Sequence, residues 1–516
     1  MNTDDCLGDH RVADGTAGIG AVCRRLVTQV IGRIGADGAV EDRCGSRILE
    51  SALLLILLRK LRELQAVQDT LARYICGARP AHPLEALVAQ AVVGTKPSAV
   101  PCGAQQLLTG FSHFTGNRKR MLIATVLTLA GVISADSVRN GYAAESHDQS
   151  GYDGFAVWTS VSLCAMRILH SNLERDMSTE LDYLINQLAR FPNGVWEGNA
   201  LAHLLALHAL HSCAPRHPLI ESGIAALIAC QNPDGGLPFV SGQEIFVTAL
   251  AGVALHTAGA APQILTALGD YLACRQQNNG GWGYTRVTTQ TDVDDTSRCV
   301  EFLRLADPGR YRQVIDHAEQ YLIGMAGPDG GFPTYVRGHP PDVDMTAGAL
   351  IALAPTAPAP VLNAATDFLI SSQHENGTFT ASWTLSEPSI MLRVIGGVLA
   401  VRAPSPELSA RISRTIAQCR ARLRETQNLD GGWGHTPGQP SNVLGTAQAV
   451  QTLCSIPAGP ELRTALSYLL NSQNPDGTFT SVPDQVGPRP IPFDFLVLAN
   501  LHALNAFTAI NDKDRP

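Results

Sequence analysis

Charged residues are scarce in this chain. Only 16% of its residues are Asp, Glu, Lys or Arg, and 38 basic residues face 46 acidic ones, which gives a formal net charge of −8. No basic tail compensates for this acidic balance. A surface of this kind does not attract a polyanion, so we expect no nucleic acid partner.

Long apolar runs are also missing. The two greasiest stretches, "SALLLILLRK" and "MLIATVLTLAGVISA", fall short of the roughly 18 apolar residues that suggest a membrane span. The amino terminus, "MNTDDCLGDHRVADG", lacks the charged and then apolar pattern of a signal peptide. We therefore expect a cytoplasmic protein whose membrane contact is at most peripheral.

Closely spaced cysteine pairs are absent as well. The chain has 12 Cys, and none of them forms a C-x-x-C pair with another. That spacing argues against a zinc site or a disulfide framework, and it favours reduced thiols in the core.

What the chain does have is a repeated phrase. Gln is followed four residues later by Gly and two residues further by an aromatic residue, as in "QQNNGGWGY" and "QNLDGGWGH". The phrase returns every 45 to 54 residues. Its glycines are Gly235, Gly280, Gly330, Gly377, Gly431 and Gly477. We expect these glycines to form turns with positive φ and the turn aromatics to clamp helix ends.

Two apolar-periodic stretches of helical length separate successive phrases. Each repeat is then a helix pair that cannot bury its inner face alone, so the repeats stack as an open solenoid or close into a ring. We predict an all-α protein with a repeat domain at 226–516, a second helical domain at 35–225, and an N-terminal segment, 1–34, that joins the repeat domain.

The densest charge lies in "TQTDVDDTSRC", Thr289 to Cys299, directly after one of these turns. Capping of the next helix accounts for one carboxylate. Three within four residues repel each other unless at least one keeps its proton. A protonated acid beside an apolar, aromatic-lined cavity suggests carbocation chemistry.

The motif D-x-D-D-T, set among Gln-Gly-Trp type repeats, resembles the class II terpene cyclases, which include squalene-hopene cyclases and bacterial labdane- and drimane-type diphosphate synthases. The resemblance implies two α/α barrels, named β and γ, with the substrate cavity between them. It makes Asp294 the proton donor, tuned by Asp292 and Asp295. The chain length favours a linear prenyl diphosphate, farnesyl or geranylgeranyl, closed to a bicycle with its diphosphate retained, because no D-D-x-x-D motif for diphosphate ionisation is present.

Further site residues follow from this hypothesis. A retained diphosphate needs cations, and Arg118, Lys119 and Arg120 form the densest basic cluster of the second domain. Glu41 and Asp42 are candidates for a Mg²⁺ that assists diphosphate binding. The aromatic candidates for cation stabilisation are Trp158, Phe246, Trp383, Phe493 and Phe495. A second acidic phrase, "PPDVDMTAG", repeats the spacing with Asp342 and Asp344, either as a helix cap or as a second polar group in the cavity.

Three alternatives stay open at this point. The substrate could be a diphosphate-free polyprene such as squalene. The chain could be a protein prenyltransferase β-like subunit, with Asp295 and Cys299 as zinc ligands. It could also be a non-catalytic ring in which the aspartates only cap a helix. The oligomeric state does not follow from the sequence.

Overall fold

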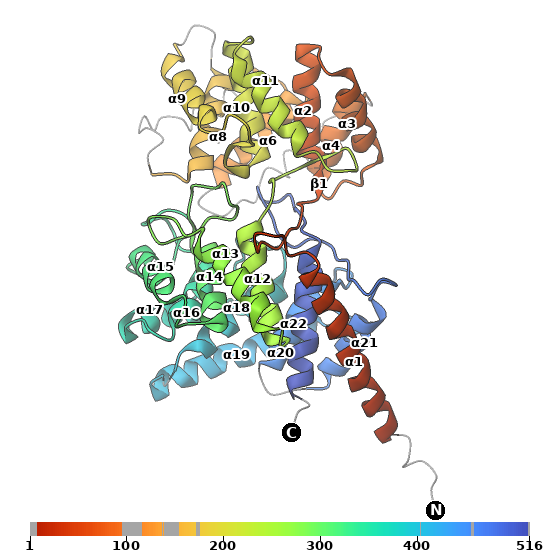
Figure 1. Ribbon diagram of the computed structural model, residues 1–516, viewed down its shortest axis with the longest axis vertical. Helices are drawn as coiled ribbons and strands as arrows, with labels where there is room; N and C mark the ends of the chain where they lie inside the picture. The colour runs from red at the N-terminus through yellow and green to blue at the C-terminus, as the bar shows by residue number, and fades with distance from the viewer. Residues whose placement is uncertain are drawn as a thin grey trace, which may run out of the picture. The chain divides into compact units, whose positions relative to one another are not determined.

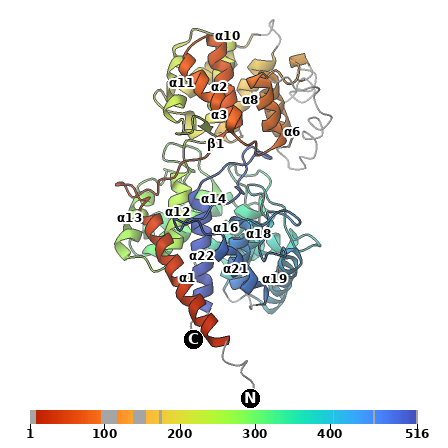
Figure 2. The same cartoon turned by 90° about the vertical axis from the view of Figure 1, so that its right-hand side faces the viewer.

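The computed structural model describes residues 8–94, 116–136, 138, 154–171, 176–402, 404–455 and 459–513. Contacts along the chain divide it into two units (Figures 1 and 2). Unit 1 comprises residues 1–42, 243–485 and 494–516, and unit 2 comprises 43–242 and 486–493. The divisions therefore fall at 42 and 242, where the sequence analysis expected 34 and 225, and a short segment near the carboxyl end belongs to unit 2.

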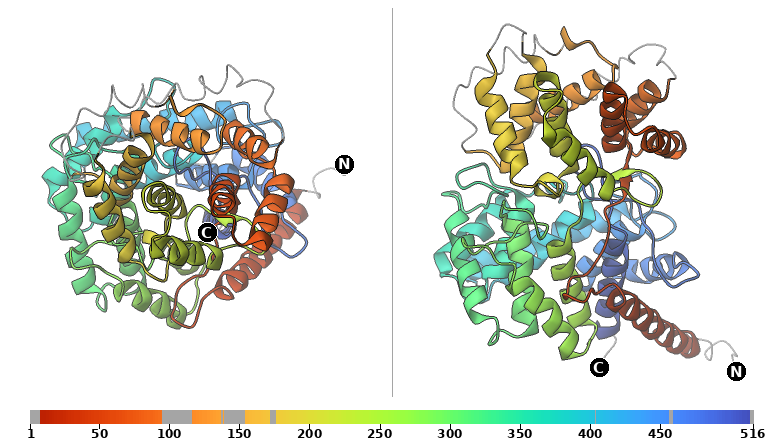
Figure 3. Two further views of the ribbon diagram at one scale, coloured as in Figure 1. Left: turned by 90° about the horizontal axis from the view of Figure 1, so that it is seen from above. Right: turned by 45° about the horizontal axis from the view of Figure 1, so that its top comes forward.

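Unit 1 is a closed ring of paired helices, visible from above in Figure 3. Each inner helix packs against the next, and the last packs against the first. The inner helices are α12 (Glu244–Thr257), α14 (Val293–Ala306), α16 (Val343–Leu353), α18 (Glu387–Ala400), α20 (Val443–Cys454) and α22 (Val497–Lys513). The outer helices are α1 (Gly8–Ile31), α13 (Pro262–Ala273), α15 (Arg312–Met325), α17 (Ala359–Ser371), α19 (Pro406–Thr426) and α21 (Glu461–Asn471). Of the two packings that the repeats allowed, the ring is the one that forms.

The N-terminal helix α1 is the sixth outer helix, because it packs on α22. The ring is thus closed by pairing the two ends of the chain within one unit. Burying the last inner helix in this way protects apolar surface that a terminal solenoid repeat would expose.

Within unit 1, the repeated phrase forms the turn between an outer helix and the next inner helix, whereas its first copy, at Gly235, follows the helix Pro218–Ala229 of unit 2. All six of its glycines have positive φ, between 83° and 90°. The turn Gln side chain donates to the glycine carbonyl, as in the bond of 2.8 Å from Gln427 to Gly431. The same Gln also donates to the Glu461 carbonyl at 2.9 Å, which starts the next outer helix. One side chain therefore joins the turn to the neighbouring repeat.

The aromatic residues of the turns are structural, as predicted. Trp282 and Trp433 are buried, and each indole Nε1–H donates at 2.8 Å to a carbonyl near the end of the preceding outer helix. Phe332, Phe379 and Phe479 are buried at the equivalent places. These rings hold the end of an outer helix against the start of an inner one.

Unit 2 is also helical. Its helices are α2 (Ile48–Leu61), α3 (Gln65–Gly77), α4 (Pro83–Val93), α6 (Gly116–Leu129), α8 (Val157–His170), α9 (Ser178–Ala189), α10 (Ala200–Cys213) and α11 (Pro218–Ala229), with a 3₁₀ turn at Trp196–Gly198. Helix α10 packs against α2, α8, α9 and α11, and its first eleven residues are buried. Two short strands, β1 (Ser46–Arg47) and β2 (Leu237–Pro238), pair antiparallel. No described helix in either unit is long and apolar enough to cross a membrane.

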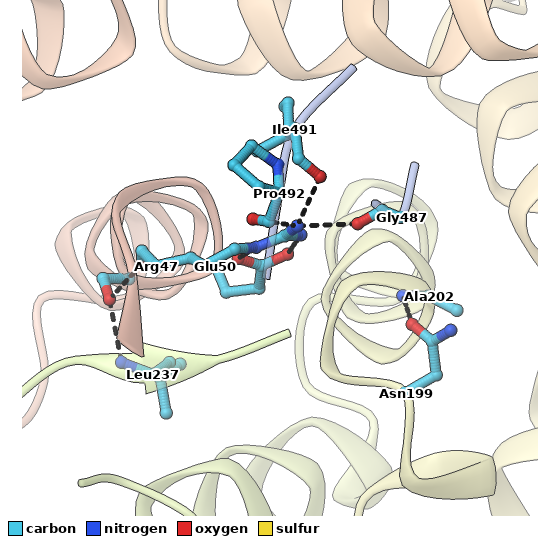
Figure 4. A network of polar contacts seen from close by, with 9 residues as sticks. Arg47, Glu50, Asn199, Ala202, Leu237, Gly487, Ile491 and Pro492 are labelled. Carbon is cyan, nitrogen blue, oxygen red and sulfur yellow. Dashed lines mark hydrogen bonds and ion pairs between the residues drawn. The ribbon is translucent and has the colours of Figure 1, made fainter. Parts of the chain in front are cut away.

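A buried arginine holds the returning segment 486–493 in unit 2 (Figure 4). The Arg47 guanidinium forms a two-pronged ion pair with the Glu50 carboxylate, with Nε 2.9 Å from Oε2. Its Nη1 donates to the carbonyls of Gly487 at 2.6 Å and Pro492 at 3.4 Å, and the Phe239 ring lies 4.3 Å from its Cζ. Because an unpaired buried charge is costly, this network fixes the path of the segment.

The ring turns can be tested with a matched pair of glycines. An ideal Cβ at Gly431 would lie 2.5 Å from the Thr464 carbonyl oxygen of α21, whereas one at Gly438 would meet nothing, and both residues have positive φ. Gly438→Ala should cost about 1 kcal/mol of stability from backbone strain alone. Gly431→Ala should cost about 3 kcal/mol, because the turn must also separate from α21. Urea unfolding followed by circular dichroism measures both, and equal losses would contradict the close packing of turn and outer helix.

Candidate active site

The three aspartates lie where α14 begins. Asp292 is the N-cap of the helix, and its Oδ1 accepts the backbone N–H of Asp295 at 2.8 Å. Its own N–H donates to the Trp282 carbonyl at 2.9 Å, and the Thr296 hydroxyl closes the turn by donating to the Asp292 carbonyl at 2.6 Å. The cap predicted for one aspartate is therefore formed by Asp292, and its position is fixed by the preceding turn.

The three carboxyl groups have different environments. Asp292 and Asp295 are buried, at 3% and 4% exposed, whereas the Asp294 side chain keeps 25% of its surface exposed. Burial raises the pKa of Asp292 to about 7. Burial, followed by the charge of Asp292, raises the pKa of Asp295 well above its usual range. The cluster therefore holds at least one proton near neutral pH, and only Asp294 can meet another molecule.

Two arginines contact Asp294. Arg298, one turn further along α14, has its Nε 3.3 Å from Oδ1 of Asp294. Arg393 on α18 has its Nη2 3.4 Å from the same oxygen. Neither arginine was among the site residues expected from the sequence. The sequence signal for Arg393 is that it is the lone cation in a mostly apolar helix, "EPSIMLRVIGGVLA".

Two of the predicted aromatic residues lie in unit 1 near acidic groups. The ring of Phe246 on α12 lies 5.6 Å from Cζ of Arg298, so it is next to the Asp294 ion pairs. Trp383 donates from Nε1 to the Thr334 hydroxyl at 3.1 Å, and that hydroxyl donates to Asp342. A contact of either ring with a substrate stays a prediction.

The other predicted aromatic residues pack within their own units. Phe495 in unit 1 is fully buried, which is the environment of a packing residue. Phe493 belongs to the returning segment of unit 2 and packs on Phe239 with ring centroids 5.2 Å apart. Trp158 is the second residue of α8, also in unit 2, and is packed against the apolar core of that unit. A contact of any of these three rings with a substrate stays a prediction.

The predicted diphosphate cations lie in the first turns of α6 in unit 2. Arg118, Lys119 and Arg120 are half-buried, and the Arg118 guanidinium lies 4.8 Å from the Phe155 ring centre. Burial lowers the pKa of Arg118 from its ordinary value. A helix N-terminus adds partial positive charge to such a cluster.

The predicted magnesium ligands Glu41 and Asp42 do not fit a metal site as arranged. Asp42 Oδ1 pairs with the Arg33 guanidinium at 2.6 Å, and Oδ2 accepts the Val497 N–H at 2.8 Å, where α22 begins. Glu41 is exposed. No group of three His, Cys, Asp or Glu side chains that could hold a metal gathers within the described ranges. A Mg²⁺ requirement stays a prediction that this pair does not support.

The second acidic phrase forms the start of α16. Asp342 accepts hydrogen bonds from the hydroxyl groups of Thr334 and Ser382. Asp344 is buried, its Oδ1 has no hydrogen-bond partner in the described part of the chain, and burial raises its pKa to about 7. Asp342 therefore belongs to the turn, whereas Asp344 is a second polar group inside the ring.

Comparison with known proteins agrees with this geometry. The model of the prenyltransferase alpha-alpha toroid domain matches residues 381–514. The drimenyl diphosphate synthase of Streptantibioticus cattleyicolor is 38% identical over 517 residues, covering 96% of both chains. That of Streptomyces showdoensis is 37% identical over 515 residues, covering 94% of this chain and 93% of the relative. The solved structure of ent-copalyl diphosphate synthase from Streptomyces platensis shares the fold, with a TM-score of 0.57 at 16% identity, over 95% of this chain and 99% of that one.

A closed α/α ring with a D-x-D-D-T acid cluster at the start of an inner helix defines a class II terpene cyclase. Within that class, the chain belongs to the family of the drimenyl diphosphate synthases, which it matches over nearly its full length. The resemblance drawn from the sequence is confirmed. The prenyltransferase alternative loses support, and burial keeps the pKa of its proposed zinc ligand Cys299 well above the usual range, which favours a neutral thiol.

The buried acid Asp344 gives a pH-dependent test of this electrostatic picture. Its folded-state pKa, about 7, lies above the ordinary value of 3.8, so the wild-type protein loses stability as pH rises from about 4 to about 7. Asp344→Asn removes that loss. The melting temperature of the variant relative to wild type should therefore become more positive by about 2 °C between pH 5 and pH 8. Scanning calorimetry at both pH values measures it, and a difference that is constant or falls with pH would contradict the assignment.

Proposed function

We propose that this cyclase isomerises farnesyl diphosphate to drimenyl diphosphate by protonating its terminal alkene and leaving the diphosphate in place. The product follows from the two full-length relatives, whose names give drimenyl diphosphate. The retained diphosphate follows from the sequence, because Arg298 stands where a D-D-x-x-D motif would need its last Asp.

The proposed reaction balances as an isomerisation. The O–H bond of Asp294 breaks, and a C–H bond forms at the terminal alkene carbon with the electron pair of that double bond. The resulting tertiary cation is attacked by the next double bond, and the new cation by the one after it, which closes two rings. A proton then leaves a carbon next to the final cation, while the C–O bond to the diphosphate stays intact. One proton enters and one leaves, so substrate and product are isomers.

The observation that carries the proposal is the asymmetry of the three carboxyl groups. Asp292 and Asp295 are buried and hold a proton, whereas Asp294 is the member that keeps exposed surface. A carboxyl cluster that keeps a proton at neutral pH can act as a Brønsted acid, and Asp294 is the member through which that proton can reach a substrate. The charges of Arg298 and Arg393 stabilise the carboxylate that remains after proton transfer.

Substrate length is the open choice within this chemistry. Geranylgeranyl diphosphate would give a labdane-type product by the same steps, and the fold shared with ent-copalyl diphosphate synthase is compatible with it. The near-complete coverage by drimenyl diphosphate synthases favours the shorter chain. A squalene-like substrate carries no diphosphate that the chain would have to bind. A ring that only binds a ligand has no need of an acid cluster.

Diphosphate binding by Arg118, Lys119 and Arg120 is a second part of the proposal, supported by their position in the first turns of α6. Magnesium is expected to assist binding through the diphosphate itself, since Asp42 is occupied by Arg33 and the Val497 N–H. A cytoplasmic location also stays a prediction.

Replacement of the proposed acid tests the activity. Asp294→Asn keeps the shape of the side chain but cannot donate the carboxyl proton, so kcat with farnesyl diphosphate and Mg²⁺ should fall by at least about 10³-fold. Asp316→Asn, which neutralises an exposed aspartate on α15, is the matched control and should keep wild-type kcat. Products are read by mass spectrometry before and after phosphatase treatment.

A bicyclic alcohol that is found only after phosphatase, and only with active variants, is the expected product. Wild-type turnover of squalene or geranylgeranyl diphosphate alone would contradict the substrate. Full activity of Asp294→Asn would contradict the role of the acid.

A further inference from the structure

Arg393 is an unusual cation. Its side chain is 10% exposed, and it lies on an inner helix of the ring rather than on the surface. Burial, followed by repulsion from the neighbouring Arg298, lowers the pKa of Arg393 to about 10. Its Nε has no hydrogen-bond partner among the described residues. Its charge instead faces acids on α14, Asp294 Oδ1 at 3.4 Å and Glu301 Oε2 at 3.7 Å.

The neighbouring inner helix, α16, has no side chain at the point where this guanidinium packs. Gly348 stands in the middle of α16, and an ideal Cβ on it would lie 2.4 Å from Nη2 of Arg393. Glycine is among the poorest residues for a helix interior, and nothing in the backbone there requires it, because Gly348 has no positive φ. Arg393, a buried cation, and Gly348, a glycine inside a helix, therefore lie next to each other, although each of them lowers the stability of the fold.

Both arginines reach the same oxygen of the acid. Arg298 Nε and Arg393 Nη2 contact Asp294 Oδ1, and no hydrogen bond to Oδ2 is found in the described part of the chain. A neutral carboxylic acid can accept such donors through its carbonyl oxygen and keep its proton on the other oxygen. The contacts thus distinguish the two oxygens.

We propose that Arg393, seated in the gap left by Gly348, is a positioning residue that holds Oδ1 of Asp294 and so directs the protonated Oδ2 toward the substrate alkene. This inference rests on the proposed function. As the O–H bond breaks, negative charge develops on the carboxyl group beside a fixed cation, so the contact strengthens toward the transition state and acts on kcat.

Gly348→Ala fills the space beside the Arg393 guanidinium without removing any charge. The added methyl group must displace the guanidinium, so kcat should fall by about 10- to 100-fold while KM stays within about twofold, since the interaction is made in the transition state. The melting temperature should stay level or rise, because Ala favours a helix interior. Gly324→Ala, at a helical position where a Cβ meets nothing, is the matched control and should keep kcat.

Arg393→Lys supplies the second variant, because it adds no atom near Gly348. A lysine keeps the charge but not the planar fork, so the inference expects a loss of kcat similar to that of Gly348→Ala, again at nearly constant KM. If Gly348→Ala has both a lower activity and a lower melting temperature, Arg393→Lys is the variant that tests the positioning role.

The two hypotheses fail in different ways. Wild-type kcat in both Gly348→Ala and Arg393→Lys, beside an inactive Asp294→Asn, would overturn the positioning role and leave the proposed function intact. Cyclisation by Asp294→Asn at the wild-type rate would overturn the proposed function and the positioning role with it.

Discussion

The turn between an outer helix and the next inner helix is the constraint on which the rest of unit 1 depends. Its glycine has positive φ, and the carbonyl of the neighbouring outer helix occupies the space of a side chain, as the Thr464 carbonyl does at Gly431. Where the turn begins with Gln, as at Gln427, that side chain bonds both to its own glycine and to the outer helix, so it fixes the repeat to the next one. The ring can then close only with its inner helices starting from these turns.

The acid cluster is a modification of one such turn. Asp292 occupies the same place as Asp342 and Asn442 in other repeats, bridged to the turn aromatic residue and followed by a helix. In this repeat the helix continues with Asp294 and Asp295, and the enclosed position keeps water away from two of the three carboxyl groups. The fold provides the cap, and the added aspartates convert it into a proton-holding group. The hydrogen bond from the Asp295 N–H to Asp292 offsets part of the cost of burying the cap carboxylate.

Much of this was predictable from the sequence because it is local. The spacing of the Gln-Gly-aromatic phrase gave the helix pairs, and D-x-D-D-T after a turn gave a capped helix with an acid. Arg393 was not predictable in this way, because it is 99 residues from Asp294 and meets it only when α14, α16 and α18 are neighbours in the ring. Asp42 shows the converse, since a plausible metal ligand in sequence becomes the acceptor for the N–H of Val497, 455 residues away. The return of 486–493 to unit 2 likewise depends on Arg47, and no local sequence pattern predicts the contact of Arg47 with that segment.

The central claim is that an enzyme acid, in exchange with solvent, starts the cyclisation. The most direct measurement is the mass of the product formed from unlabelled farnesyl diphosphate in D₂O, after phosphatase treatment and correction for exchangeable hydroxyl deuterium. The account predicts a bicyclic product that carries one deuterium on carbon, because the carboxyl proton of Asp294 is replaced by deuterium before it is transferred. A cyclised product without deuterium, or one that has lost its diphosphate during the reaction, would contradict it.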